Sequence, residues 1–226
     1  DCIGGVILYD ETINQTSNNR KAIPAMISET GAVPGIKVDT GAKDLANSLD
    51  EKVTEGLDGL RERLKRYYDL GARFAKWRGV YIIGEKYPSK LAINSNAHAL
   101  ARYSALVQEC GMVPIVEPEV LMDGDHTAED CLIKTSEVIQ KCFEELLIHK
   151  IDLTGIILKP NMILAGNKSK NKVSNEEVSY KTLECLKKSV PNEVPGIAFL
   201  SGGQSEIEAT ENLNLINKNN NTNFIM

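Results

Sequence analysis

Residues 112–120 read Met-Val-Pro-Ile-Val-Glu-Pro-Glu-Val, an apolar run with two carboxylates near its end. Runs of Val and Ile that are apolar on both faces are typical of parallel strands buried inside an α/β fold. Five further stretches share this character: residues 2–9, 34–38, 73–82, 156–162 and 197–200. The sequence therefore predicts six buried parallel strands, of which residues 112–120 form the fourth.

Amphipathic segments lie between these runs. Apolar residues recur at helical spacing around Leu60, around Leu100 and through residues 132–146. Residues 174–177 and 205–208 each have the capping-box pattern that begins a helix. Strands that alternate with helices indicate consecutive βα units and one parallel sheet.

The spacing of the strands indicates a barrel. A charged or polar residue stands near five strand ends, at intervals of about 40 residues: Lys37, Lys76, Glu117, Lys159 and Ser201. A regular interval without a repeated consensus fits consecutive units of one barrel better than two domains. We therefore predict an α/β fold of the (β/α)8 TIM-barrel type, with about six of the eight βα units in residues 1–217. Residues 218–226 are rich in Asn and are predicted to be a divergent tail.

Composition argues against several other classes of protein. The 26 Lys and Arg residues face 31 Asp and Glu, and the net charge of -5 is the opposite of what a nucleic-acid-binding protein shows. We find no run of about 18 uncharged apolar residues and therefore expect no membrane span. The five cysteines include no C-x-x-C pair and the three histidines no H-x-x-x-H or similar spacing. These patterns predict buried thiols in a reducing compartment, and neither a metal site nor a His-based triad.

Charge inside the predicted strands is the feature that points to function. Four consecutive strands carry it: Lys37, Lys76, Glu117 with Glu119, and Lys159. Buried lysine and glutamate are costly unless they are paired. The two-residue period of a strand places Lys76 and Arg78 on one side, and it does the same for Glu117 and Glu119. If these sides face the barrel axis, the charges converge where barrel enzymes keep their active sites, although ion pairs with a structural role would give the same pattern.

A lysine in such a cluster can act as a nucleophile. Burial disfavours the charged ammonium, so the pKa of the amine falls and the free amine can attack a carbonyl to form a Schiff base. Loss of the carbinolamine hydroxyl as water then requires a proton donor, and a carboxyl held between lysines is suited to that task. Lys159 fits the nucleophile because it follows an apolar run and precedes Pro160, where the strand must end. Glu117 with Lys76 fits the supporting pair.

The stretch Ser201-Gly202-Gly203-Gln204-Ser205 joins an apolar run to a capped helix. Its glycines allow backbone N–H groups to approach an anion, and barrels often bind phosphate at a turn of this kind. An ordinary left-handed turn is the alternative. Its position beside the lysines favours phosphate binding.

Five motifs together resemble class I fructose-bisphosphate aldolase. They are Gly35-Ile36-Lys37-Val38-Asp39, Phe74-Ala75-Lys76-Trp77-Arg78, Val116-Glu117-Pro118-Glu119, Leu158-Lys159-Pro160-Asn161-Met162 and Phe199-Leu200-Ser201-Gly202-Gly203-Gln204-Ser205. The resemblance runs from about residue 1 to about residue 217, in order and at the family's spacing. Each motif alone is modest, but the set is highly specific.

The resemblance implies roles for residues at matching positions. Four would be catalytic: Lys159 as the Schiff-base lysine, Glu117 as the acid/base, Lys76 beside it, and Glu119 in the same carboxylate cluster. Four would bind the substrate and its phosphates: Lys37 and Arg78 at the distal phosphate, and Ser201 and Gly202 at the phosphate of the ketone half.

The family also implies a reaction and a setting. Fructose 1,6-bisphosphate would be cleaved in glycolysis to dihydroxyacetone phosphate and glyceraldehyde 3-phosphate, without metal or cofactor. The complete protein would be a cytoplasmic homotetramer that binds a phosphorylated sugar and no nucleic acid. Binding of actin or of an adhesin tail would follow from what is known of some family members.

The sequence departs from the family at both ends. The family has a strand before the position of Cys2 that carries an aspartate used in carbon–carbon cleavage, and an eighth strand after Asn217; neither has a match here. The alternative hypothesis is therefore a truncated, non-catalytic aldolase fragment with at most a binding role. Another Schiff-base barrel enzyme, such as a transaldolase, would explain the Glu117 and Glu119 pair beside Trp77 and Arg78 less well.

Overall fold

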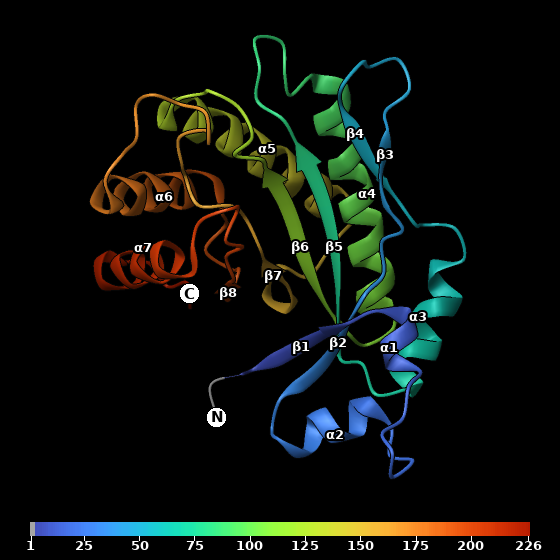
Figure 1. Cartoon of the computed structure of the whole chain (residues 1–226). Helices are drawn as coiled ribbons and strands as arrows, with labels where there is room; N and C mark the ends of the chain where they lie inside the picture. Colours follow the sequence, from blue (N-terminus) through green and yellow to red (C-terminus); the bar gives the residue numbers. More distant parts are fainter. Residues whose placement is uncertain (1–2) are drawn as a thin grey trace.

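One parallel sheet organises the chain, and its six strands lie side by side in the order in which they occur in the sequence (Figure 1). The computed structural model describes residues 3–226. The strands are β1 (Gly5–Leu8), β2 (Val33–Lys37), β5 (Phe74–Tyr81), β6 (Val113–Val120), β7 (Ile157–Leu158) and β8 (Gly196–Ile197). All neighbouring pairs are parallel. The prediction of six parallel strands is confirmed, although β7 and β8 are shorter than the apolar runs that predicted them.

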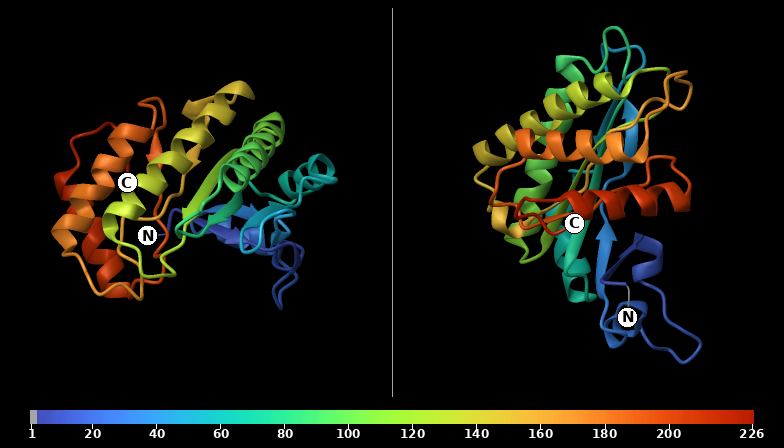
Figure 2. Two further views of the ribbon diagram at one scale, coloured as in Figure 1. Left: turned by 90° about the horizontal axis from the view of Figure 1, so that it is seen from above. Right: turned by 90° about the vertical axis from the view of Figure 1, so that its left-hand side faces the viewer.

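The helices follow the strands and cover the outside of the sheet. They are α1 (Asp10–Ile13), α2 (Ile23–Glu29), α3 (Leu60–Asp69), α4 (Lys90–Glu109), α5 (Ala128–Ile148), α6 (Asn175–Ser189) and α7 (Glu206–Asn219), with a short 3-10 helix at Leu153–Gly155. Seen from above, α3 to α7 form an arc around the sheet (Figure 2). This is the arrangement of a partial (β/α)8 barrel. None of the helices in the described part of the chain is long and apolar enough to cross a membrane.

The capping residues explain where the long helices begin. The box predicted at residues 205–208 is complete, because Ser205 and Glu208 each accept a hydrogen bond from the backbone of the other. At α6, Ser174 accepts a hydrogen bond from the N–H of Glu177, so Ser174 is the N-cap as predicted. A capping box between Thr127 and Asp130 begins α5. It was not predicted from the sequence. There aspartate performs the role that Glu or Gln usually fills.

An antiparallel hairpin between β2 and α3 was not predicted. It consists of β3 (Gly41–Asp44) and β4 (Lys52–Glu55). Its strands are short, polar and mostly exposed, so they lack the apolar pattern on which strand prediction rests. Thr54 anchors the hairpin, since its hydroxyl donates to the carbonyl of Arg78 at 2.6 Å and its N–H donates to Asn96 of α4. The hairpin therefore braces the carboxyl end of β5.

The core packs α4 against the middle of the sheet. Trp77 and Tyr103 are completely buried, and their ring centroids are 5.5 Å apart. The Tyr103 hydroxyl donates to the carbonyls of Ala75 and Ile115, at 2.7 and 3.2 Å. One hydroxyl thus links β5 to β6 at Ala75 and Ile115, just before the charged residues of the two strands.

The cysteines agree with the prediction of reduced, buried thiols. The four in the described residues are all free, and Cys131, Cys142 and Cys185 are buried whereas Cys110 is partly exposed. Burial raises the pKa of Cys142 and Cys185 to about 12, which makes both thiols poor nucleophiles. Cys2 lies outside the described residues.

The last residues run beside β8. Ile225 forms a bridge with Gly196, and its carbonyl accepts a hydrogen bond from Ile197 at 2.9 Å. Phe224 is buried against the main core. The assignment of residues 218–226 as a divergent tail stays a prediction.

Two loops at the carboxyl end of the sheet approach each other so closely that one position requires glycine. A Cβ atom on Gly166 would lie 2.3 Å from the carbonyl oxygen of Gly124, in the loop between β6 and α5. We expect Gly166→Ala to lower the free energy of unfolding by about 1–3 kcal/mol, because backbone must move to admit the methyl group. Urea unfolding would measure this. Gly4→Ala is the matched control, since a Cβ there has no atom within 4 Å; similar midpoints for the two variants would contradict the close approach.

Candidate active site

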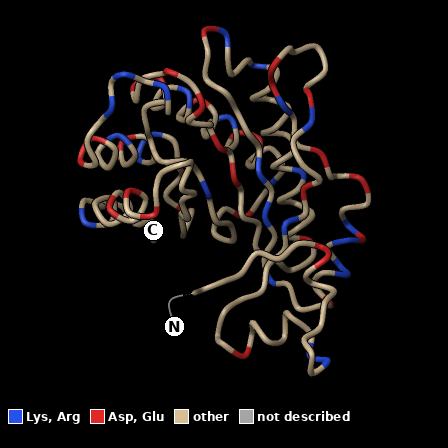
Figure 3. Tube along the Cα trace, in the orientation of Figure 1, with Lys and Arg blue, Asp and Glu red and all other residues tan. Residues whose placement is uncertain are grey.

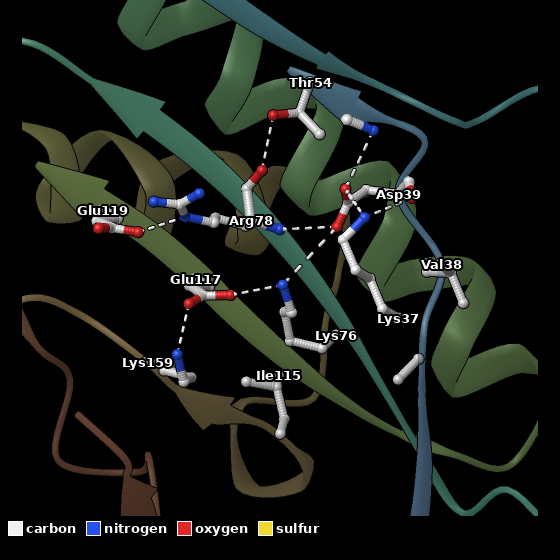
Figure 4. A network of polar contacts seen from close by, with 12 residues as sticks. Lys37, Val38, Asp39, Thr54, Lys76, Arg78, Ile115, Glu117, Glu119 and Lys159 are labelled. Carbon is white, nitrogen blue, oxygen red and sulfur yellow. Dashed lines mark hydrogen bonds and ion pairs between the residues drawn. The ribbon is translucent and has the colours of Figure 1, made fainter. Parts of the chain in front are cut away.

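The charged side chains predicted from the strands meet at the carboxyl end of the sheet (Figure 4). Lys37 is the last residue of β2 and lies opposite Lys76 in β5. Arg78 in β5 lies opposite Glu117 in β6. Lys159 follows β7, and its N–H donates to the carbonyl of Val116 at 2.7 Å. Parallel pairing in register thus brings together residues that are about 40 positions apart in the chain.

Glu117 is the centre of the cluster. It is 3% exposed, and its Oε1 is 2.5 Å from Lys159 Nζ while its Oε2 is 3.0 Å from Lys76 Nζ. The contact with Lys76 is an ion pair whose geometry does not align as a hydrogen bond, so Oε2 has no hydrogen-bond donor among the described residues. The structure therefore places one carboxylate between two lysines, as the chemistry of imine formation requires.

Asp39 belongs to the same cluster, although no role was predicted for it from the sequence. Its Oδ1 is 2.7 Å from Lys37 Nζ and its Oδ2 is 4.0 Å from Lys76 Nζ. The carboxylate also accepts from the N–H groups of Arg78 and Gly41. Asp39 is two residues after Lys37, and this spacing predicts that both side chains lie on the same side of the strand, as it does for Lys76 and Arg78. Asp39 thus contacts both ammonium groups, closely that of Lys37 and more distantly that of Lys76.

Arg78 and Glu119 form a second pair at the edge of the cluster. Arg78 Nε donates to Glu119 Oε2, and this hydrogen bond raises the pKa of Arg78 above its ordinary value. The side chain of Arg78 is 43% exposed whereas that of Glu119 is 7% exposed. The guanidinium is thus permanently charged and reaches toward solvent, where a ligand could meet it.

The composition of the cluster favours a chemical role over a structural one. Its charged groups are Lys37, Lys76, Arg78, Lys159, Asp39, Glu117 and Glu119, which leave an excess of positive charge. Buried ion pairs rarely stabilise a fold more than apolar residues of the same size would, because desolvation offsets the attraction. A formal excess of one positive charge, on partly exposed cations at the carboxyl end of barrel strands, is instead suited to an anionic ligand.

A cleft of about 460 Å³ connects this cluster with the turn after β8. Arg78, Glu117 and Glu119 line one side, and Ser201 and the glycines after it line the other. A second, more apolar cavity of about 460 Å³ is lined by Lys159 with Ile115 and Ile157. Lys159 does not line the polar cleft itself, but its ammonium contacts Glu117, which does. The polar cleft is large enough for a small phosphorylated molecule.

The turn after β8 lines this cleft through Ser201, Gly202 and Gly203. Gly202 and Gly203 have φ values of +59° and +85°, which glycine adopts without strain. Within the described residues, neither of their N–H groups donates to a protein acceptor. At the start of α7, by contrast, the backbone N–H of Ser205 already donates to the carboxylate of Glu208. An anion here would depend on the Ser201 hydroxyl and the glycine N–H groups more than on the end of α7.

His126 lies in the loop between β6 and α5 and is buried. It is 7% exposed, and neither ring nitrogen has a hydrogen-bond partner among the described residues. Burial lowers the pKa of His126 below its ordinary 6.5, against the opposing effect of nearby aspartates, chiefly Asp130. The folded chain thus holds this imidazole neutral at a pH where the unfolded chain would protonate it.

This difference predicts a pH dependence of stability. Below about pH 6.5 the unfolded chain binds a proton at His126 that the folded chain excludes, so stability falls as the pH decreases. Between pH 7 and pH 5, we expect wild type to lose more unfolding free energy than His126→Gln, which cannot titrate. Urea unfolding of both proteins at the two pH values tests this. An equal loss in both would show that His126 is not the group responsible.

The cluster contains no histidine or cysteine. In the part of the chain that the structure describes, the one group that could hold a metal ion lies elsewhere, at His98, Glu145 and His149. The absence of a metal site was predicted from the spacings of cysteines and histidines, without the glutamates. Glu145 and His149 are four residues apart on one helix, and that spacing was a signal that the prediction did not use.

Comparison with known proteins gives consistent matches. A family model described as fructose-bisphosphate aldolase class-I matches residues 1–225. The chain is 50% identical over 216 residues to the cytosolic fructose-bisphosphate aldolase 4 of Arabidopsis thaliana. It is 51% identical over 214 residues to a probable class 1 fructose-bisphosphate aldolase of Xanthomonas campestris pv. campestris. These alignments cover 96% and 95% of this chain.

A solved structure also matches this chain. Fructose-bisphosphate aldolase from Plasmodium falciparum, in a ternary complex with TRAP and a small-molecule inhibitor, superposes with a TM-score of 0.96 at 42% identity. The match covers 98% of this chain and 65% of that one. The chain spans 55% and 64% of the lengths of the Arabidopsis and Xanthomonas relatives.

Proposed function

This chain belongs to the class I fructose-bisphosphate aldolase family, and from that premise we propose that it carries the Schiff-base centre for cleavage of fructose 1,6-bisphosphate. The products would be dihydroxyacetone phosphate and glyceraldehyde 3-phosphate, in glycolysis. The observation that carries the proposal is the position of Glu117 between Lys159 and Lys76.

The first step would activate Lys159. Its ammonium is 2.5 Å from Glu117 Oε1, so one proton transfer produces both a nucleophilic amine and a protonated carboxyl. The amine attacks the ketone carbon of the substrate, and the resulting carbinolamine loses its hydroxyl as water when Glu117 donates the proton. Lys76 stays charged beside Glu117 and stabilises the carboxylate that this donation leaves behind.

The imine then withdraws the electrons of the adjacent carbon–carbon bond. That bond breaks to leave an enamine on Lys159, while the neighbouring hydroxyl gives its proton to the Glu117 carboxylate left by the dehydration step and becomes the aldehyde of the departing product. The family aspartate that would serve this cleavage step has no counterpart in these 226 residues. Glu119, paired with Arg78, would keep the carboxylate cluster in place during the step.

The two phosphates would bind at opposite ends of the cleft. Ser201 and Gly202 would hold the phosphate of the ketone half through a hydroxyl and an N–H group that the protein does not otherwise use. Lys37 and Arg78 would hold the distal phosphate, and Arg78 is suited to it because its guanidinium is partly exposed. Neither contact requires a metal ion or a cofactor.

Reductive trapping tests the proposal. With dihydroxyacetone phosphate and borohydride, the chain should gain the mass of one reduced adduct, and peptide mapping should locate it on Lys159. A complete aldolase treated in the same way is the positive control. If the control is labelled and this chain is not, the alternative of a non-catalytic fragment with at most a binding role gains support.

Partners and location are proposed from the family. The relatives include proteins named as cytosolic, which supports a cytoplasmic protein, and the complete protein would be a homotetramer. The Plasmodium falciparum aldolase was solved in complex with TRAP, which supports an adhesin tail as a further partner, whereas actin is proposed from the family resemblance alone. We propose no nucleic-acid partner. Sedimentation of the purified protein would measure its oligomeric state.

A further inference from the structure

Two histidines and one glutamate converge on the outer surface of the helices, away from the charged cluster. His98 belongs to α4, whereas Glu145 and His149 lie at the end of α5, which packs against α4 (Figure 1). One potential ligand atom from each residue lies within 4.8 Å of the other two. Nδ1 of His98 is 3.4 Å from Glu145 Oε2, and Nδ1 of His149 is 3.9 Å from the same oxygen. The two imidazole rings are 5.0 Å apart, edge to face.

From this geometry we propose that His98, Glu145 and His149 bind a divalent transition-metal ion such as Zn²⁺. Two imidazoles and one carboxylate are a common ligand set for zinc, which leaves a fourth position open to water. Zinc holds such ligands at about 2.0–2.2 Å, so the donor atoms need to approach one another by only about 1 Å. Rotation of these side chains provides that movement without a change in the helices.

The helices preorganise the site. Glu145 and His149 are four residues apart, which places both on one face of α5. The end of a helix carries partial negative charge from its free carbonyls and so favours a cation, and the last turn of α5 contains no Lys or Arg that would supply one. The extensive packing of α4 against α5 keeps His98 opposite this face.

The existing contacts of Glu145 and His149 leave donor atoms available for a cation. Lys141 contacts Oε1 at 3.2 Å and leaves Oε2 toward His98. Nδ1 of His149 lies 2.8 Å from the carbonyl oxygen of Glu145. As a donor there, Nδ1 leaves Nε2 as the metal-binding nitrogen of His149, so the 3.9 Å from Nδ1 to Glu145 Oε2 locates the ring and is not a distance between two ligand atoms.

Stability alone does not account for this arrangement. The side chain of His98 is 53% exposed, and an ion pair at such a position contributes little to folding. A metal ion would join all three groups, whose potential ligand atoms lie within 4.8 Å of one another.

Titration of the purified chain with Zn²⁺ and with Co²⁺ tests the proposal. We expect one metal equivalent to bind, with the visible absorption of Co²⁺ reporting nitrogen and oxygen ligands. His98→Ala, Glu145→Gln and His149→Ala should each weaken binding by at least about tenfold. Because His98 is exposed, His98→Ala should keep the wild-type circular dichroism and melting curve, so a loss of binding will not reflect unfolding.

Two control variants keep the test specific. Glu144→Gln removes a neighbouring carboxylate that contacts only Lys141, and Cys110→Ser removes the partly exposed thiol; both should leave metal affinity unchanged. Loss of binding in Cys110→Ser, or equal affinity in wild type and the histidine variants, would overturn the proposal. Trapping of Lys159 with borohydride should be unaffected in every variant, so this result is independent of the proposed aldolase function.

Discussion

Replacement of Lys159 by methionine should abolish Schiff-base trapping and lower cleavage of fructose 1,6-bisphosphate by roughly 10⁴–10⁶-fold in the complete protein. Methionine has similar length but no amine, so no imine can form and the electron sink for bond cleavage is lost. The fold should persist, because Glu117 keeps its contact with Lys76 at 3.0 Å. Borohydride trapping and a coupled assay of product release would measure both effects.

Lys134→Met is the matched control for this experiment. Lys134 forms a partly exposed ion pair with Glu137 on α5, outside the charged cluster, and its loss should change neither trapping nor turnover. Trapping at an undiminished level in Lys159→Met would show that another lysine, such as Lys76, is the nucleophile. Turnover near the wild-type rate would rule out the Schiff-base mechanism for this chain.

Replacement of Glu117 by glutamine should affect both catalysis and stability. The amide cannot donate the proton that removes the carbinolamine hydroxyl, so we expect imine formation to slow by about 10²–10⁴-fold. The same change leaves Lys76 buried, with Asp39 at 4.0 Å as its nearest remaining carboxylate. The loss of one partner from a buried ion pair typically costs about 3–5 kcal/mol, and the presence of Asp39 favours the lower end of that range.

Two comparisons separate these effects. The rate of borohydride trapping at saturating dihydroxyacetone phosphate reports imine formation, and urea unfolding reports stability. Glu119→Gln should leave the trapping rate closer to that of wild type, since Glu119 contacts Arg78 and neither lysine. Glu137→Gln is the exposed control and should change neither quantity. If Glu117→Gln forms the imine at the wild-type rate, another group donates the proton.

Much of the fold followed from local pattern. Val- and Ile-rich runs that are buried on both faces predicted six parallel strands, and the structure contains six. The hairpin of β3 and β4 escaped prediction because its residues are polar and exposed, so its position depends on Thr54 and the partners that Thr54 finds on β5 and α4. Local pattern predicts elements that bury apolar faces, and it does not predict elements held by polar anchors.

Part of the candidate site was also predictable from local sequence pattern. Lysine and glutamate inside a buried strand are costly, so their presence at Lys76, Glu117 and Lys159 predicted a cluster before any geometry was known. Asp39 was visible in the same motif as Lys37, but it stands just after its strand, where an exposed aspartate is ordinary. Only the structure shows that it is buried and contacts the neighbouring strand.

The sequence by itself determined which segments would be buried and which side chains share one face of a strand. Both depend on apolar residues and on the alternation of side chains within short segments. The sequence thereby determined the parallel sheet, the charged strand ends and the family. Tertiary structure alone decided which charges meet. The parallel register of β5, β6 and β7 places Glu117 between two lysines, and the packing of α4 on α5 brings His98 to Glu145 and His149. Distances between segments far apart in the chain depend on how whole elements pack, and no local pattern contains that information.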